Sequence, residues 1–234
     1  MIIVLKHDWF VNAGQIYILW EKMPAATPGP LLIFTFSLAT FLLYSQPTLT
    51  VASPGPAFSQ SSGADYIRSS CGATLYPKIC YTSLSRYASA VQQSPGRLAR
   101  VAINVSLSKA LRMTAYLSNL TRQADFGGDH RAAAALQDCV SNMGDAVDEM
   151  RGSLKQMSQV GAAGLSTESF QFQMSNVQTW MSAALTDEET CTDGFEDVAD
   201  GAVKTEVCNR AADAKKFTSN ALALVNTYAA AGTP

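Results

Sequence analysis

The sequence predicts an all-α protein, an up-down-up-down four-helix bundle preceded by a short helical hairpin. Three observations predict this fold. Four long segments each contain one seam of apolar residues spaced three and four positions apart, the period of a helix that buries one face. Short breaks containing glycine or helix-capping residues separate these segments. No segment shows the two-residue alternation of a half-buried strand. Long helices joined by short connections pack as antiparallel neighbours.

Composition limits the possible functions. The chain has 234 residues, of which 47% are hydrophobic and 15% are charged, so it has enough apolar material for an ordered core. The net charge of −2 argues against a nucleic-acid or polybasic membrane binder, which needs a cationic surplus. Only two histidines are present, which argues against histidine-based catalysis and histidine-rich metal sites.

The first part of the chain has the pattern of a targeting segment. Residues 31–45 are apolar and uncharged, and the small residues Thr50 and Ala52 suit a signal peptidase, so we expect cleavage near Ala52. We therefore expect residues 1–52 to be an N-terminal extension and signal peptide, residues 53–63 a linker, and residues 64–234 the working domain. An uncleaved signal anchor is the alternative, and the true start could be Met23.

Secretion changes the interpretation of two other sequence features. Residues 104–106 and 119–121 are sequons, which makes Asn104 and Asn119 candidate glycosylation sites. An oxidising compartment also favours disulfides among the five cysteines.

Residues 65–87 are expected to form the short helices that precede the bundle. Pro77 interrupts this segment between Cys71 and Cys80, so two short helical pieces can fold back and bring the two sulfur atoms together. Its apolar residues are Tyr66, Ile67, Leu75, Tyr76 and Leu84.

The first two long helices have recognisable starts. Ser94 is a capping residue followed by proline, and it begins a helix that extends to about residue 123. A break at residues 126–128 follows, and Asp129 can cap a second helix that ends near residue 159. The expected stripe of the first helix is Leu107, Leu111, Thr114 and Leu117. The expected seam of the second is Val140, Met143, Val147, Met150, Leu154 and Met157.

The last two helices follow the same pattern. Residues 161–164 form a break, and Ser166 can cap the third helix. A turn at residues 193–194 separates it from a fourth helix, which extends from about residue 200 to 228. The third seam is Phe170, Met174, Val177, Met181 and Ala184. The fourth is Val203, Val207, Ala211, Ala214, Phe217, Ala221, Leu224 and Tyr228.

The cysteine positions leave the pairing open. Cys139 lies in the second long helix and Cys191 just past the third, and such positions can face each other in an antiparallel pair. Cys208 remains on the last helix, where a buried free thiol is the simplest interpretation. No two cysteines have the CxxC spacing of a zinc site, and we expect neither a metal nor a cofactor.

Several spaced motifs resemble the plant invertase and pectin methylesterase inhibitor family over about residues 64–230. Near the hairpin these are residues 66–71 (YIRSSC), 74–77 (TLYP), Cys80 and 83–87 (SLSRY). Within the bundle they are residues 138–139 (DC), 145–149 (DAVDE), 179–186 (TWMSAALT), 190–195 (TCTDGF) and 218–226 (TSNALALVN).

The resemblance implies a protein without enzymatic activity that forms a one-to-one complex with a cell-wall enzyme in the apoplast. It implies disulfides Cys71–Cys80 and Cys139–Cys191, with Cys208 free. The expected partner is pectin methylesterase, bound by a monomer that has no stable membrane association. Acid invertase is the alternative target, although the Pro-Lys-Phe motif typical of invertase inhibitors is absent around Phe126. A secreted binding bundle without inhibitory activity is a further alternative.

Similarity to the family also predicts the contact residues. The second long helix carries acidic and polar residues opposite its apolar seam, at Asp138, Ser141, Asn142, Asp145, Asp148 and Glu149. The family covers its target's cleft with such a surface, which assigns target contacts to Asp145, Asp148, Gln178, Thr190 and Asp193. These acids lie on a convex helix face without a nucleophile or metal partner, which argues against general acid–base catalysis. Carboxylates that become protonated in the complex would make binding tighter as pH falls.

Overall fold

The computed structural model describes residues 60–123, 128–160 and 165–232, and these residues form helices and turns without a strand. They belong to one unit that spans residues 52–234. The expected signal peptide and the connection around Phe126 lie outside the described residues. The all-α fold predicted from the sequence is confirmed.

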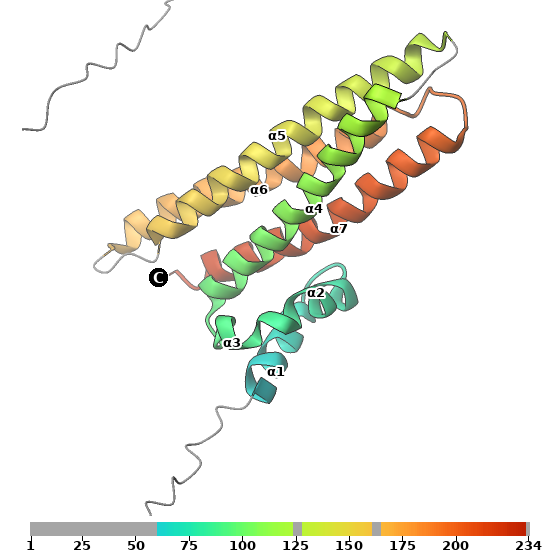
Figure 1. Cartoon of the computed structure of the whole chain (residues 1–234). Helices are drawn as coiled ribbons and strands as arrows, with labels where there is room; N and C mark the ends of the chain where they lie inside the picture. Colours follow the sequence, from blue (N-terminus) through green and yellow to red (C-terminus); the bar gives the residue numbers. More distant parts are fainter. Residues whose placement is uncertain (1–59, 124–127, 161–164, 233–234) are drawn as a thin grey trace, which may run out of the picture. The chain divides into compact units, whose positions relative to one another are not determined.

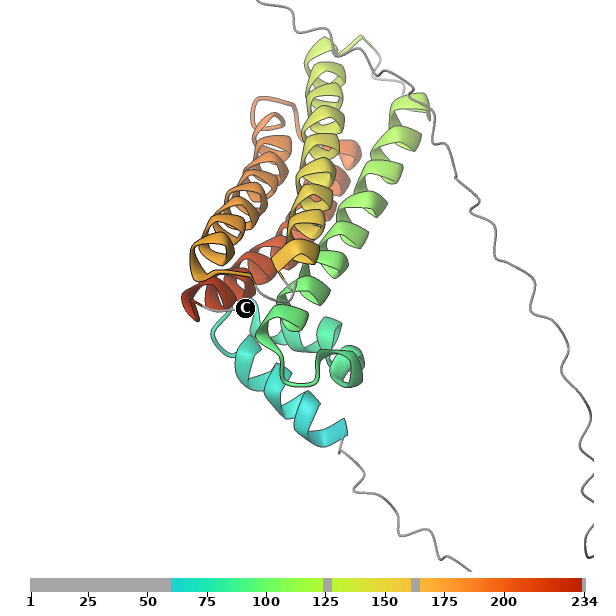
Figure 2. The same cartoon turned by 90° about the vertical axis from the view of Figure 1, so that its left-hand side faces the viewer.

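Four long helices form the bundle (Figures 1 and 2). They are α4 (Pro95–Gln123), α5 (His130–Val160), α6 (Thr167–Asp193) and α7 (Ala202–Ala230). Helices α4 and α6 both pack against α5 and α7, so the four helices form a closed ring in chain order. The α4–α7 and α5–α6 pairs are therefore opposite sides of this ring.

The helix starts predicted from capping residues are confirmed. The Ser94 hydroxyl accepts a hydrogen bond from the backbone N–H of Arg97 (3.4 Å). Asp129 Oδ1 accepts from the backbone N–H of Ala132 (3.1 Å), and Ser166 Oγ accepts from that of Ser169 (3.2 Å). Each bond satisfies a donor that the first turn of a helix leaves without a partner.

The hairpin consists of α1 (Gln60–Cys71), α2 (Pro77–Leu84), the 3₁₀ turn η1 (Ser85–Tyr87) and α3 (Ala88–Val91). Helix α1 begins at Gln60, four residues before the expected start of the domain at residue 64. Gly63 allows α1 to approach α3 closely, because a Cβ atom there would lie 2.8 Å from the carbonyl oxygen of Ala88.

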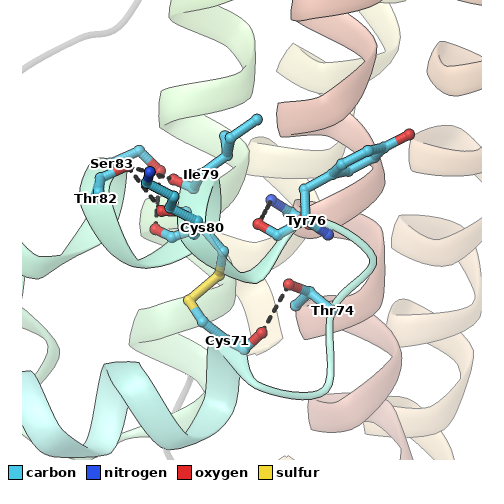
Figure 3. Close-up of a disulfide and its surroundings, with 9 residues drawn as sticks. Cys71, Thr74, Tyr76, Ile79, Cys80, Thr82 and Ser83 are labelled. Carbon is cyan, nitrogen blue, oxygen red and sulfur yellow. Dashed lines mark hydrogen bonds between the residues drawn. A yellow bond between two sulfur atoms is a disulfide. The ribbon is translucent and has the colours of Figure 1, made fainter.

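Two hydrogen bonds attach the hairpin to the bundle. The backbone N–H of Tyr76 donates to Asn220 Oδ1, and Asn220 Nδ2 donates to the carbonyl of Tyr76, both at 3.0 Å. The Cys71–Cys80 disulfide closes the turn beside this contact (Figure 3), and the Thr74 hydroxyl donates to the carbonyl of Cys71 (2.8 Å). The hairpin is thus held by a covalent bond within itself and by a buried amide of α7.

Most of the predicted apolar seams are buried. The α6 seam lies entirely in the core, whereas Val140 and Leu154 of α5, and Val203 and Phe217 of α7, are only partly buried. The prediction for α4 is right at Leu117, which is fully buried, and wrong at Leu111, which is 40% exposed. Before Leu117 the buried face lies one position earlier than predicted, at Ser106, Ala110 and Met113. Ser106 is tolerated there because its hydroxyl is hydrogen-bonded to that of Thr218 on α7 (2.7 Å).

None of the helices in the described ranges combines the length and the apolar character needed to span a bilayer.

Candidate functional site

A disulfide aligns α5 with α6. Cys139 and Cys191 are both buried and bonded, across 52 positions of sequence. Cys191 lies in the last turn of α6, not past its end as the sequence suggested. Because the two helices are antiparallel, residues that follow Cys139 face residues that precede Cys191. This register decides which polar side chains meet on the outer edge of the α5–α6 seam.

Trp180 lies on this seam against a glycine. A Cβ atom at Gly152 would be 3.0 Å from Cε3 of the Trp180 ring, so the missing side chain leaves space for the indole. Trp180 remains 36% exposed. An exposed tryptophan that rests on a neighbouring helix is held in place and available for contact with a partner.

Three carboxyl groups meet on the same seam, between Trp180 and the Cys139–Cys191 disulfide. Asp145 and Glu149 are one turn apart on α5, and Asp187 faces them from α6. The pKa of Glu149 is raised to about 7, first by burial, then by a hydrogen bond between its protonated form and Asp187, and by the negative charges of Asp187 and Asp145. Burial also raises the pKa of Asp187; the hydrogen bond from Glu149 opposes this, the charge of Asp145 adds to it, and the net direction is upward. The cluster of Asp145, Glu149 and Asp187 therefore gains negative charge as pH rises through neutrality.

The cluster is partly open to solvent, and its charge state changes the groups it offers. Asp145 is exposed, and in the described part of the chain no group of three or more His, Cys, Asp or Glu side chains is arranged to hold a metal ion. A neutral Glu149 offers an O–H donor, and its ionised form offers only acceptors. The arrangement can therefore present a different surface to a partner in acid than near neutrality.

The residues predicted from the family fall on three parts of the bundle. Asp145 lies in the cluster, whereas Asp148 is exposed and forms an ion pair with Arg151 (2.8 Å). Gln178 is on the α7 flank of α6, where its Nε2 donates a hydrogen bond to Asn226 Oδ1 (2.9 Å). Thr190 and Asp193 are both exposed near the end of α6. The structure thus brings Asp145 beside Asp187, but it does not bring Gln178 to the same seam.

Sequence reasoning missed Asp187 and Trp180. Both belong to α6, and their partners belong to α5, so local spacing contains no signal for either contact. The expected Cys139–Cys191 pairing could have located them, because it fixes which turn of α6 faces Glu149 and Gly152.

The remaining predicted modification sites lie away from this seam. Asn104 and Asn119 are both exposed on α4, and the Asn104 side chain donates to the carbonyl of Arg100 (2.9 Å). Cys208 is a half-buried free thiol on α7, and burial raises its pKa, which lowers its reactivity. Glycosylation of the two asparagines stays a prediction.

A helical hairpin, a four-helix bundle and two disulfides define a class of small, covalently braced helical domains. Residues 65–224 match the family described as Plant invertase/pectin methylesterase inhibitor, and the chain belongs to this family.

Two curated plant relatives and one solved structure illustrate the relationship. The chain is 39% identical over 198 residues to Pectinesterase inhibitor 11 of Arabidopsis thaliana, which covers 84% of this chain and 95% of the relative. It is 39% identical over 183 residues to the 21 kDa protein of Daucus carota, covering 78% of this chain and 90% of the relative. The fold matches the crystal structure of mutant form A of a pectin methylesterase inhibitor from Arabidopsis with a TM-score of 0.52. That match covers 67% of this chain and 92% of the other at 20% identity.

Proposed function

We propose that the chain is a secreted inhibitor of pectin methylesterase that acts in the cell wall and has no catalytic activity of its own. The observation that carries this proposal is the 39% identity to Pectinesterase inhibitor 11 along 95% of that protein. The inhibitor forms a one-to-one complex and covers the pectin-binding cleft of the enzyme.

The α5–α6 seam is the surface we assign to the enzyme. Its exposed Trp180 provides an aromatic anchor, and the cluster of Asp145, Glu149 and Asp187 provides polar contacts. The exposed Asp148, Thr190 and Asp193 extend the same acidic surface, and Gln178 contributes at its α7 edge. The Cys139–Cys191 disulfide holds the two helices in register, which reduces the entropy lost on binding.

An alanine double variant tests this assignment. D145A/D148A removes two exposed carboxylates from α5. If each carboxylate contributes roughly 1 kcal/mol or more to binding, inhibition of a plant pectin methylesterase should weaken by at least about tenfold. Methanol release during titration of the enzyme measures the effect. Circular dichroism should remain unchanged, because both side chains are exposed.

The matched control removes the same charge elsewhere. D65A/D213A changes two exposed acids outside the α5–α6 seam and should inhibit like the wild type. Equal inhibition by D145A/D148A and the wild type would exclude the seam as the contact surface. A parallel titration against acid invertase distinguishes the second target of the family, because loss of hexose release alone would identify invertase as the partner.

A further inference from the structure

Basic residues are concentrated on the side of the bundle opposite the α5–α6 seam. Helix α4 contains Arg97, Arg100, Lys109, Arg112 and Arg122 and has no acidic residue. The hairpin adds further basic side chains next to α4, among them Arg86 of η1. The small net charge of −2 therefore conceals an uneven distribution, with a basic α4 and an acidic α5–α6 face.

Part of this basic side is hollowed into a groove. A hollow of about 430 Å³ lies between the hairpin, α4 and α7, and a second one of about 170 Å³ continues it along the α4–α7 seam. Lys109 and Arg112 line both hollows. We call the two together the basic groove. The larger hollow is within the size range of small-ligand sites. Besides Tyr87, its polar lining consists of Thr82, Ser83, Arg86, Ser108, Lys109 and Arg112.

Two of the three cations in the larger hollow, Arg86 and Lys109, are held by aromatic rings, and none of the three has an acidic partner. Lys109 Nζ lies 4.2 Å from the centre of the Phe217 ring, and the Arg86 guanidinium lies 4.8 Å from that of Tyr87. Arg86 also donates a hydrogen bond to the Tyr87 hydroxyl (2.9 Å). Across the described ranges, no carboxylate lies within ion-pair distance of Arg86, Lys109 or Arg112. Cation–π contacts position these charges while leaving them free to bind an anion.

The acidic residues near the smaller hollow are already neutralised. Asp213 forms an ion pair with Lys216 (2.7 Å), and Glu206 forms one with Arg210. Asp213 itself lines the smaller hollow, but it is the only acid among the lining residues of the two hollows and it is paired with Lys216, so the lining keeps a net positive charge. Potentials of one sign in a concave site concentrate ligands of the opposite charge.

We propose that the basic groove binds an acidic oligosaccharide with free uronate carboxylates. The three unpaired cations match carboxylates, and Val105 with Phe217 provides apolar surface for the sugar ring. The hydroxyls of Thr82, Ser83 and Ser108 each donate to a backbone carbonyl, so their oxygen atoms remain as acceptors for sugar hydroxyls. This inference rests on the proposed function for its choice of polymer, because pectin methylesterase converts methyl esters of a galacturonan into free carboxylates. Since the groove and the α5–α6 seam use opposite helix pairs, the inhibitor can bind the polymer and the enzyme at the same time.

Calorimetry on the full chain, produced in a eukaryotic secretory host, tests the proposal. The probe is a de-esterified oligogalacturonate, without divalent cations and at low ionic strength. We expect binding, and at least about tenfold weaker binding of the fully methyl-esterified oligomer of the same length. K109Q/R112Q should lower affinity for the de-esterified oligomer by at least about tenfold. R112Q alone, at an exposed position, should lower it in the same direction.

The matched control is R100Q/R122Q, which removes two exposed charges from the same helix outside both hollows. It should change affinity by less than about twofold. An equal loss in both double variants, equal binding of the esterified oligomer, or equal binding of duplex DNA would overturn the proposal. So would self-association of the chain that K109Q/R112Q abolishes, since the occupant would then be a second copy.

The same proteins separate this inference from the proposed function. K109Q/R112Q should inhibit pectin methylesterase like the wild type, because neither residue lies on the α5–α6 seam. A chain that binds the oligomer and inhibits no esterase would contradict the proposed function alone. A chain that inhibits and does not bind the oligomer would contradict the groove alone.

Discussion

Glu188 is a fully buried carboxyl group in the bundle core. Burial raises its pKa to about 8, and the nearby Thr218 hydroxyl and Lys215 ammonium offset this only in part. Neither carboxylate oxygen makes a hydrogen bond of normal geometry with any described residue. Glu188 is therefore neutral in the folded protein at acidic pH, whereas in the unfolded chain it ionises near its ordinary pKa of 4.5.

This difference in pKa predicts that the stability of the folded protein decreases as pH rises. The folded pKa lies above the unfolded one, so the contribution of Glu188 is fully present below about pH 4.5 and is lost as pH rises toward about 8. The loss is at most about 5 kcal/mol, from ~1.4 kcal/mol for each pKa unit. E188Q stays neutral and should show a much smaller decrease in Tm over this range. Thermal unfolding at several pH values measures it.

The neighbouring residue provides the control for this prediction. Glu189 is exposed and pairs with Lys215 (3.1 Å), so E189Q should keep the wild-type dependence of Tm on pH. If the Tm of E188Q and that of the wild type decreased equally with rising pH, the buried carboxyl of Glu188 could not be the source of the decrease.

At the scale of helix pairs, the α5–α6 cluster predicts tighter inhibition in acid. The pKa of Glu149 is about 7 in the free chain, and burial against an enzyme would raise it further. The complex then takes up a proton, so affinity rises as pH falls from about 8 to about 6, by about tenfold for each additional pKa unit. Inhibition constants measured across this range should show the trend. E149Q should flatten it, whereas E189Q should leave it unchanged.

Helix boundaries could be predicted from sequence because their causes are local. A capping bond such as that of Ser94, Asp129 or Ser166 joins residues two or three positions apart, and both partners are visible in a short window. The buried face of α4 could not be predicted in the same way. Ser106 is buried because of a partner 112 positions away, so its polarity misled the assignment of the apolar stripe.

At the scale of the whole molecule, the candidate site could be predicted only in part. Asp145 was expected from the acidic face of one helix, but its neighbour Asp187 depends on how two helices are aligned. The basic groove was hidden for a related reason. A net charge of −2 argued against a nucleic-acid or polybasic membrane binder but contains no information on local clusters. Only the packing of α4, α7 and the hairpin reveals that Lys109 and Arg112 are free of acidic partners.

The two disulfides predict that the two surfaces can be impaired separately. Cys71–Cys80 closes a ring of 9 positions in the hairpin, whose Thr82 and Arg86 line the basic groove. Cys139–Cys191 closes a ring of 52 positions and aligns α5 with α6 along their seam. The chain-entropy model gives stabilities of about 3 and about 4 kcal/mol for these rings. We expect C71A/C80A to weaken binding of the uronate oligomer while it retains inhibition.

C139A/C191A should show the opposite pattern, with weaker inhibition, because α5 and α6 lose their covalent alignment. Calorimetry with the oligomer, esterase titration and thermal unfolding on each variant measure the three effects, and C208A, which removes only the free thiol, should match the wild type in all of them. Loss of both activities in each disulfide variant would show that hairpin and bundle act as a single cooperative unit. Separate losses would mean that the fold holds two independent surfaces, each braced by its own disulfide.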